Sequence, residues 1–423
     1  MSSLPMKGVT VLAAEQMHSL PHATQLMALM GAEVIKVEPV GGEAGRFGRP
    51  DIIDSDGRPT GSTFLRNNLA KTSVGIDLKQ RAGRELFLRL AATVDVVAEN
   101  FRPGTADGLG IGYDAVRATN PSVIYVSVSG FGNRPEPPSP YRQWAAYAPI
   151  VEGMAGLYEY SRAGDERPRP AVAGALGDTG PGLYAVIGVL AALFERTMTG
   201  LGAHVDIAMY DAMIAIADVV HPASMGVDPS RALDGIGILH TFRAEDGWFA
   251  VEVVREAHFP RFAQAVGHPE WISDERLASR RGWSDHMETV IRPGVEAWAS
   301  SLGKLEAASR LAEQGVAAGP VNSAADIVSD AHVRGRRLVH QIRVDDREVA
   351  VVGNPIAFHS QPAPLVAPAP RPPGTGPADR SADRAERPPR WPLLGEGTER
   401  VLAGRLGLTP SEIDDLRAQG VIT

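Results

Sequence analysis

Residues 8–38 follow a strand–helix–strand pattern, and this pattern constrains the fold more than any other feature of the chain. The apolar run GVTVLAA (8–14) predicts a buried strand, and HATQLMALMG (22–31) predicts a helix that ends at Gly31. AEVIKVE (32–38) predicts a second strand. Because a helical crossover returns the chain to the same end of a sheet, the two strands are expected to be parallel neighbours.

The same alternation continues through the first half of the chain. Segment 81–92 predicts a helix, and segments 94–100 and 122–130 predict strands. After Pro181, apolar residues recur at helical spacing, which predicts one apolar helix face built from Leu183, Val186, Ile187, Leu190, Leu193 and Phe194 and a stop at Gly200 or Gly202. The pattern predicts an α/β fold with a mostly parallel sheet and helices on both faces.

Composition along the chain suggests two domains. Residues 1–220 and 340–423 are expected to form one large domain, and residues 225–335, with their own strand–helix series, a smaller inserted domain. Residues 362–392 hold ten prolines, too many for a packed segment, and predict a linker or loop.

The overall composition narrows the function. A formal net charge of -8 provides no broad basic surface, so we expect no nucleic-acid partner. The chain has no cysteine, which excludes disulfides and thiol catalysis. It also lacks a recognisable signal peptide and any run of about 18 uninterrupted apolar residues. We therefore expect a soluble, cytoplasmic protein with no membrane partner.

The sequence contains no strong match to a dinucleotide-binding or metal-binding motif. The turn after the first predicted strand, AAEQMHSLPHA, has no glycine, and the glycine-rich GLGIGY (108–113) does not directly follow a strand. Neither fits the dinucleotide fingerprint, so no nicotinamide or flavin is expected. His18 and His22 are the only closely spaced histidines and lack a third ligand nearby, so we predict no metal site.

Asp178 stands in an unusual setting, in the stretch GALGDTGPG. Its position before Pro181 and an apolar helix is typical of a helix N-cap. However, Gly177 and Gly180 remove side chains on both sides, so a bulky ligand could approach the carboxylate closely. A helix N-terminus would also stabilise negative charge that develops nearby. The two interpretations are compatible.

Several motifs in a fixed order resemble the class III coenzyme A-transferases, a group that includes formyl-CoA, carnitine and bile-acid CoA-transferases. The resemblance is close over residues 8–210 and returns from about residue 350 to the C-terminus. It rests on the stretches PHATQLMALMGAEVIKVE, KTSVGIDLK, VDVVAENFRPGTADGLGIGYDAV, NPSVIYVSVSGFG, GALGDTGPGLYAVIGVLAALFER and PLLGEGTERVLAGRLGL.

This resemblance implies a Rossmann-like large domain with a smaller inserted domain, in an interlocked homodimer. It implies transfer of coenzyme A, as a co-substrate, from an acyl-CoA donor to a carboxylic acid acceptor. Asp178 matches the family's nucleophile, which forms an aspartyl-CoA thioester. No metal, nicotinamide or flavin is implied.

The resemblance also implies residues that contact coenzyme A or line the site: His18, Ile76, Asp77, Leu78, Lys79, Asn100, Phe101, Arg102, Gln143 and Trp144. His18 stands where a glutamine or a small residue is usual. Pro39 and Gly108 replace basic residues that are usual in the family, and Arg46 or Arg66 are candidates to compensate.

Two alternatives stay open at this point. The related α-methylacyl-CoA racemases pair the aspartate with a histidine, because moving an α-proton needs a second acid–base group. This chain has Trp144 at about that place and no histidine between residues 23 and 203, which disfavours a racemase. A non-catalytic CoA-binding protein would be expected to lose Asp178, which is present.

Overall fold

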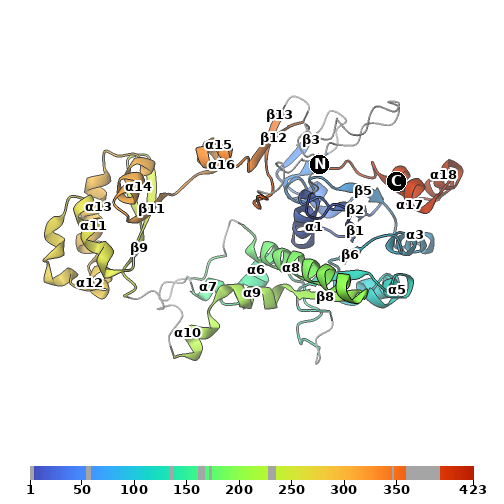
Figure 1. Ribbon diagram of the computed structural model, residues 1–423, viewed down its shortest axis with the longest axis horizontal. Coiled ribbons are helices and arrows are strands. Elements are labelled where there is room, and N and C mark those ends of the chain that lie inside the picture. Colours follow the sequence, from blue (N-terminus) through green and yellow to red (C-terminus); the bar gives the residue numbers. More distant parts are fainter. Residues whose placement is uncertain are drawn as a thin grey trace. The chain divides into compact units, whose positions relative to one another are not determined.

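The structure is a computed structural model, and it describes residues 4–53, 59–133, 138–160, 167–170, 174–226, 235–344, 347–358 and 391–423. Contacts divide the chain into two compact units (Figure 1). Unit 1 comprises Met1–Arg162, Glu166–Asp218 and Arg334–Thr423, and unit 2 comprises Ala163–Asp165 and Val219–Val333.

The described part of unit 1 contains a six-stranded sheet in which every strand pair is parallel. Its strands are β1 (Thr10–Ala14), β2 (Glu33–Glu38), β5 (Thr72–Gly75), β6 (Val96–Glu99), β7 (Ile124–Ser129) and β8 (Ala203–Ala208). The order β5-β2-β1-β6-β7-β8 is that of a doubly wound Rossmann-type sheet, with its reversal between β1 and β6. The predicted parallel α/β class is confirmed.

Helices cover both faces of this sheet. The helices in the described part of unit 1 are α1 (Ser19–Leu29), α2 (Ser62–Asn67), α3 (Arg81–Ala91), α4 (Thr105–Leu109), α5 (Tyr113–Thr119), α6 (Ala148–Met154), α7 (Leu157–Tyr160), α8 (Leu176–Thr199), α9 (Met209–Ala217), α17 (Thr398–Leu406) and α18 (Pro410–Ala418), with a 3₁₀ turn η1 (Ala44–Phe47). Val11 and Ala13 of β1 pack in a core shared with α1, α8 and α9. Leu12 and Ala14 point to the opposite face, in a core shared with α3, α5, α17 and α18.

Two short hairpins complete the described part of unit 1. β3 (Asp51–Ile53) pairs with β4 (Pro59–Gly61), and β12 (Val339–Val344) pairs with β13 (Arg347–Val352). A small core joins them to α2 through Phe64 and to Trp391. Residues 362–390 of the predicted linker lie outside the described residues.

Helix α8 differs from its prediction in two respects. It begins at Leu176, five residues before Pro181, although it ends as expected before Gly200, whose φ of 71° closes it. Its buried face consists of the smaller residues Ala185, Val186, Val189 and Ala192, whereas Leu183, Ile187, Leu190 and Phe194 are exposed. The prediction of one apolar face was incomplete, because small apolar side chains on the other side let the helix pack closely on its neighbours.

The length and apolar character of α8 would suffice for a membrane span. Within this fold, 44% of its most apolar window is buried. The helix packs against α1, α6 and α9.

Unit 2 is built around an antiparallel sheet with the order β11-β10-β9, from β9 (Ile238–Ala244), β10 (Gly247–Val253) and β11 (Ala317–Pro320). Its helices are α10 (Val220–Ser224), α11 (Phe259–Ala265), α12 (Arg280–Asp285), α13 (Arg292–Ala299), α14 (Lys304–Glu313) and α15 (Ala324–Ser329), with short turns η3 (Glu256–His258), η4 (Pro269–Ile272), η5 (Glu275–Leu277) and η6 (Met287–Ile291). Helix α16 (Ala331–Gly335) crosses the boundary between the units. Phe242, Phe249 and Phe262 lie at the centre of this unit's own core.

Candidate active site

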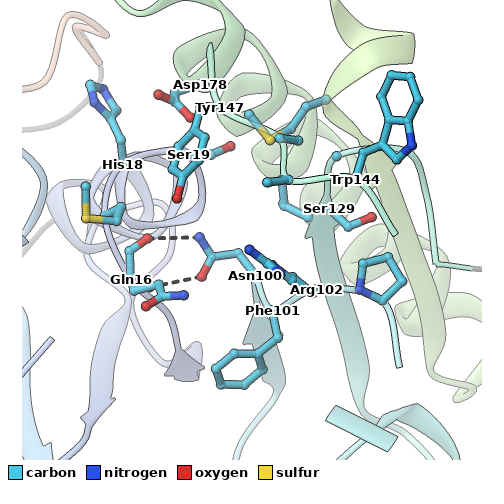
Figure 2. A pocket seen from close by; sticks show the side chains of 17 residues that line it. Gln16, His18, Ser19, Asn100, Phe101, Arg102, Ser129, Trp144, Tyr147 and Asp178 are labelled. Carbon is cyan, nitrogen blue, oxygen red and sulfur yellow. Dashed lines mark hydrogen bonds between the residues drawn. The ribbon is translucent and has the colours of Figure 1, made fainter. Parts of the chain in front are cut away.

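A pocket of about 140 Å³ lies at the carboxyl edge of the parallel sheet. The strand order reverses between β1 and β6, and in open α/β sheets this point forms a crevice that binds ligands. The lining residues come from the segments that follow β1, β6, β7 and β8, from the loop before α6 and from α8 (Figure 2): Gln16, Met17, His18, Ser19, Asn100, Phe101, Arg102, Pro103, Val128, Ser129, Gly130, Trp144, Ala145, Ala146, Tyr147, Asp178 and Met209.

Asn100 joins the two loops on either side of the switch point. Its Oδ1 accepts a hydrogen bond from the backbone N–H of Gln16, and its Nδ2 donates to the carbonyl of Gln16, both at 2.9 Å (Figure 2). The next N–H, of Phe101, donates to the Glu99 carboxyl at 2.8 Å. The two Asn100 bonds fix the loops after β1 and β6 relative to each other.

Buried charged side chains lie beneath the loop after β1 and hold it in place. Glu43 accepts a hydrogen bond from the N–H of Met17 at 3.1 Å, and Met17 has a φ of 64°, a strained value for a side chain of its size. Lys36 lies 3.6 Å from both Glu15 and Glu43, and Lys71 lies 2.7 Å from Glu15. Burial would raise the pKa of Glu15, but Lys71 and Lys36 outweigh it and hold that pKa below its usual value.

Asp178 lies in the first turn of α8, and its side chain faces the pocket (Figure 2). The residue at the N-cap position is Ala175, with a φ of 41°, and no side chain caps the helix. The predicted cap role of Asp178 was therefore wrong, because the helix begins earlier than Pro181 suggested. Burial and then the charge of Glu152 raise the pKa of Asp178, and Arg66 lowers it; together these influences bring the pKa from 3.8 to about 6.

His18 and two serines place unpartnered polar atoms in the same pocket. Within the described residues, His18 Nε2, Ser19 Oγ and Ser129 Oγ are buried without a hydrogen-bond partner. Burial, reinforced by Arg66 and His22, lowers the pKa of His18 to about 4, so its ring is neutral at pH 7. Such groups are available to bind a polar ligand, because a buried polar atom without a partner is costly.

The structure brings six of the predicted site residues together in this pocket: His18, Asn100, Phe101, Arg102, Trp144 and Asp178. The stretch Ile76–Lys79 and Gln143 do not line it. Ile76 is buried and bridges to Ile422, whereas Lys79 and Gln143 are exposed. Their contacts with coenzyme A stay predictions.

The two arginines suggested as replacements for lost basic residues differ sharply. Arg46 is buried, donates twice to the Glu38 carboxylate at 2.7 Å and stacks on Phe64, so it is not available to a phosphate. Arg66 is exposed at the end of α2, and the structure gives its side chain no ion pair or hydrogen bond with a described residue. Arg102 is also exposed, at the rim of the pocket.

Sequence reasoning missed several pocket residues, among them Gln16, Ser19, Ser129 and Met209. Gln16, Ser19 and Ser129 had an available signal, because each lies at or shortly after the carboxyl end of a predicted strand, where parallel sheets bind ligands. Nothing in the sequence singled out Glu152. Across the described ranges, no three side chains of the metal-ligating types converge on one point.

Comparison with known proteins identifies the family. The model for CoA-transferase family III matches residues 6–375. The chain is 32% identical to the succinyl-CoA–L-malate CoA-transferase beta subunit of Chloroflexus aurantiacus, over 100% of this chain and 99% of that protein. It is 28% identical to the formyl-CoA:oxalate CoA-transferase of Streptomyces coelicolor, over the full length of both.

Solved structures agree with this assignment. A CAIB/BAIF family protein from Brucella suis superposes with a TM-score of 0.78 at 28% identity, over 96% of this chain and 100% of that one. The protein Rv3272 from Mycobacterium tuberculosis gives a TM-score of 0.75 at 26% identity, over 95% of this chain and 99% of its own. The chain therefore belongs to CoA-transferase family III and is a class III CoA-transferase.

Proposed function

We propose that this enzyme moves coenzyme A from an acyl-CoA donor to a carboxylic acid acceptor through an aspartyl-CoA thioester on Asp178. The observation that supports this most is the state of the Asp178 carboxylate. It faces a pocket at the switch point of the sheet, and the described residues give it no hydrogen bond. A half-buried carboxylate without partners is a reactive nucleophile rather than a structural group.

The proposed reaction has four exchanges. The Asp178 carboxylate attacks the thioester carbonyl of the donor, which forms a mixed anhydride and releases the CoA thiolate. The thiolate attacks the aspartyl carbonyl, which gives the aspartyl-CoA thioester and frees the donor's carboxylate. The acceptor carboxylate then attacks this thioester and again releases the thiolate. Attack of the thiolate on the acceptor's carbonyl gives the new acyl-CoA and restores Asp178.

Neutral donors around the pocket suit the tetrahedral intermediates of these exchanges. We assign this role to the imidazole of His18 and the hydroxyl of Ser19, both unpartnered and in the pocket with Asp178. The N-terminal end of α8 adds positive potential near the developing oxyanion. Arg102 and Lys79, both exposed, are assigned to the phosphates of coenzyme A.

The substrates are proposed to be small carboxylic acids. A pocket of about 140 Å³ has room for a short acyl group, and its unpartnered hydroxyl and imidazole groups favour a polar one. The named activities of the relatives, with succinyl-CoA and malate or formyl-CoA and oxalate, involve acids of this kind. We propose that the enzyme is a cytoplasmic homodimer.

The test is mass spectrometry of the purified protein after reaction with a panel of acyl-CoAs, acid quenching and digestion. We expect a CoA-sized adduct on the peptide that carries Asp178, which disappears when a competent acid is added. Asp178→Asn should form no adduct yet still bind CoA. Measurable CoA binding without an adduct from any donor would contradict the mechanism, and exchange of the substrate's α-proton with solvent would instead support the racemase alternative.

A further inference from the structure

Glu152 is a buried carboxylate directly behind the turn that carries Asp178. It lies on α6, is 3% exposed and does not line the pocket. Its Oε1 accepts a hydrogen bond from the N–H of Gly177 at 2.8 Å, and its Oε2 accepts one from the hydroxyl of Tyr158 at 2.6 Å. Acceptance at both oxygens is the behaviour of an ionised carboxylate.

Close packing makes the contact between α6 and the start of α8 specific. Ala148 and Glu152 are four residues apart on α6 and therefore share one face. A Cβ at Gly177 would lie 2.7 Å from the Cα and the carbonyl oxygen of Ala148, so only glycine permits this approach. Ala175, just before the turn, has a left-handed φ of 41°, which the surrounding contacts must hold in place.

Four titratable or charged groups face Asp178 or its neighbours in the pocket. Glu152 approaches from α6, Arg66 from α2, and His18 and His22 from the start of α1. Burial lowers the pKa of both histidines to about 4, so they are neutral when Asp178 ionises. After burial itself, the negative charge of Glu152 is the main influence that opposes ionisation of Asp178, and Arg66 acts against it.

We propose that Glu152 is a positioning residue of the transferase reaction, which holds the turn that presents Asp178 and sets a second negative charge beside it. This inference rests on the proposed nucleophilic role of Asp178. Repulsion between the two carboxylates makes Asp178 a stronger base and nucleophile. The repulsion ends when Asp178 becomes an anhydride or a thioester, because both are neutral. Glu152 therefore favours the covalent intermediates over the free enzyme.

Three variants separate the charge of Glu152 from its hydrogen bonds. Glu152→Gln keeps an acceptor for Gly177 and removes the charge, Glu152→Ala removes both, and Tyr158→Phe keeps the charge and removes one donor. In E152Q, we expect the acidic limb of the kcat/KM profile to move down by about half a pH unit, with less aspartyl-CoA adduct at steady state and an unchanged KM. E152A should show the same shift and a further loss of kcat of about tenfold, because the turn is loosened. In Y158F, the acidic limb of the kcat/KM profile should lie at the same pH as in the wild type.

The proposal is overturned if the acidic limb of the kcat/KM profile of E152Q lies at the same pH as in the wild type. It is also overturned if E152Q and E152A have equal kcat values. Urea unfolding provides a readout that does not depend on activity. At pH 8, Asp178→Asn should raise the urea midpoint more in the wild-type background than in E152Q, because only the former contains the repulsion. Equal increases in both backgrounds would also overturn it.

The two readouts distinguish this proposal from the proposed function. One outcome is that urea unfolding of D178N in the two backgrounds shows the repulsion while D178N still forms the adduct. In that case Asp178 is not the nucleophile, and Glu152 has no catalytic role through it. If D178N forms no adduct but E152Q behaves as wild type in both assays, the nucleophile stands and the role of Glu152 fails.

Discussion

At the level of single residues, the surroundings of Asp178 make its carboxylate more reactive and do not add to the stability of the fold. Burial and Glu152 raise the pKa of Asp178 from 3.8 to about 6. The folded state therefore holds the proton more tightly than the unfolded state, and the protein loses stability through this group as the pH rises from about 4 to 6. Above that range the ionised carboxylate costs the folded state on the order of 2 kcal/mol, allowing for its partial exposure.

Replacing Asp178 by asparagine should remove this cost. We expect Asp178→Asn to have a higher free energy of unfolding than the wild type at pH 8, and an advantage about 1 kcal/mol smaller at pH 5. Urea unfolding followed by circular dichroism at both pH values measures this difference. A variant that is less stable than the wild type at pH 8 would show that the carboxylate makes a structural contact and contradict its assignment as a poised nucleophile.

The site residues differ in how far the sequence could reveal them. Asp178 stands out locally because glycines flank it, and Asn100 because it follows a predicted strand. Glu152 carries no local signal, since it reaches the Asp178 turn from 25 residues away through the packing of two helices. Contacts of this kind depend on the tertiary fold and cannot be found from periodicity or motif.

At the level of elements, the loop after β1 depends on the buried charges beneath it. Lys71 Nζ donates to Glu15 at 2.7 Å, to the carbonyl of Pro21 at 2.9 Å and to Asn68 Oδ1 at 2.9 Å. Lys71→Met would leave Glu15 with the more distant Lys36 and should lower the free energy of unfolding by about 3–5 kcal/mol. Urea unfolding at pH 7 measures the loss.

Two further variants control for this prediction. Glu15→Gln combined with Lys71→Met should be more stable than Lys71→Met alone, because the double variant leaves no uncompensated buried carboxylate. Arg81→Ala breaks an ion pair with Glu85 that is exposed to water, and should leave the urea midpoint unchanged. Equal midpoints for Lys71→Met and Arg81→Ala would show that the buried charges do not hold the loop.

The bounds of β2 and α8 show which elements the sequence pattern can predict and which it cannot. The predicted strand 32–38 agrees with β2 (Glu33–Glu38) to within a residue, because the β-branched residues Val34, Ile35 and Val37 favour a strand. Helix α8 was predicted five residues too short, because Pro181 is typical of a first turn and here lies inside the helix. The first turn is held instead by Glu152 of α6.

At the level of the whole molecule, α8 is apolar on both sides. One side packs in the core, and the other leaves Ile187 61% exposed and Phe194 and Met198 each 68% exposed. An exposed apolar row of this kind on one helix is typical of an interaction surface. We expect a second copy of this chain to cover it, as the predicted homodimer requires.

Charges placed in this row should prevent assembly. We expect Ile187→Glu combined with Phe194→Glu to shift the protein from dimer to monomer in size-exclusion chromatography with light scattering, since each glutamate would be desolvated at the interface. Leu305→Glu is a matched control, because Leu305 is a similarly exposed apolar residue on α14 in unit 2. A wild-type protein that remains monomeric over a wide range of concentrations would contradict the dimer. A double variant that stays dimeric would instead place the interface on another surface, and the exposed row of α8 would then need a different partner.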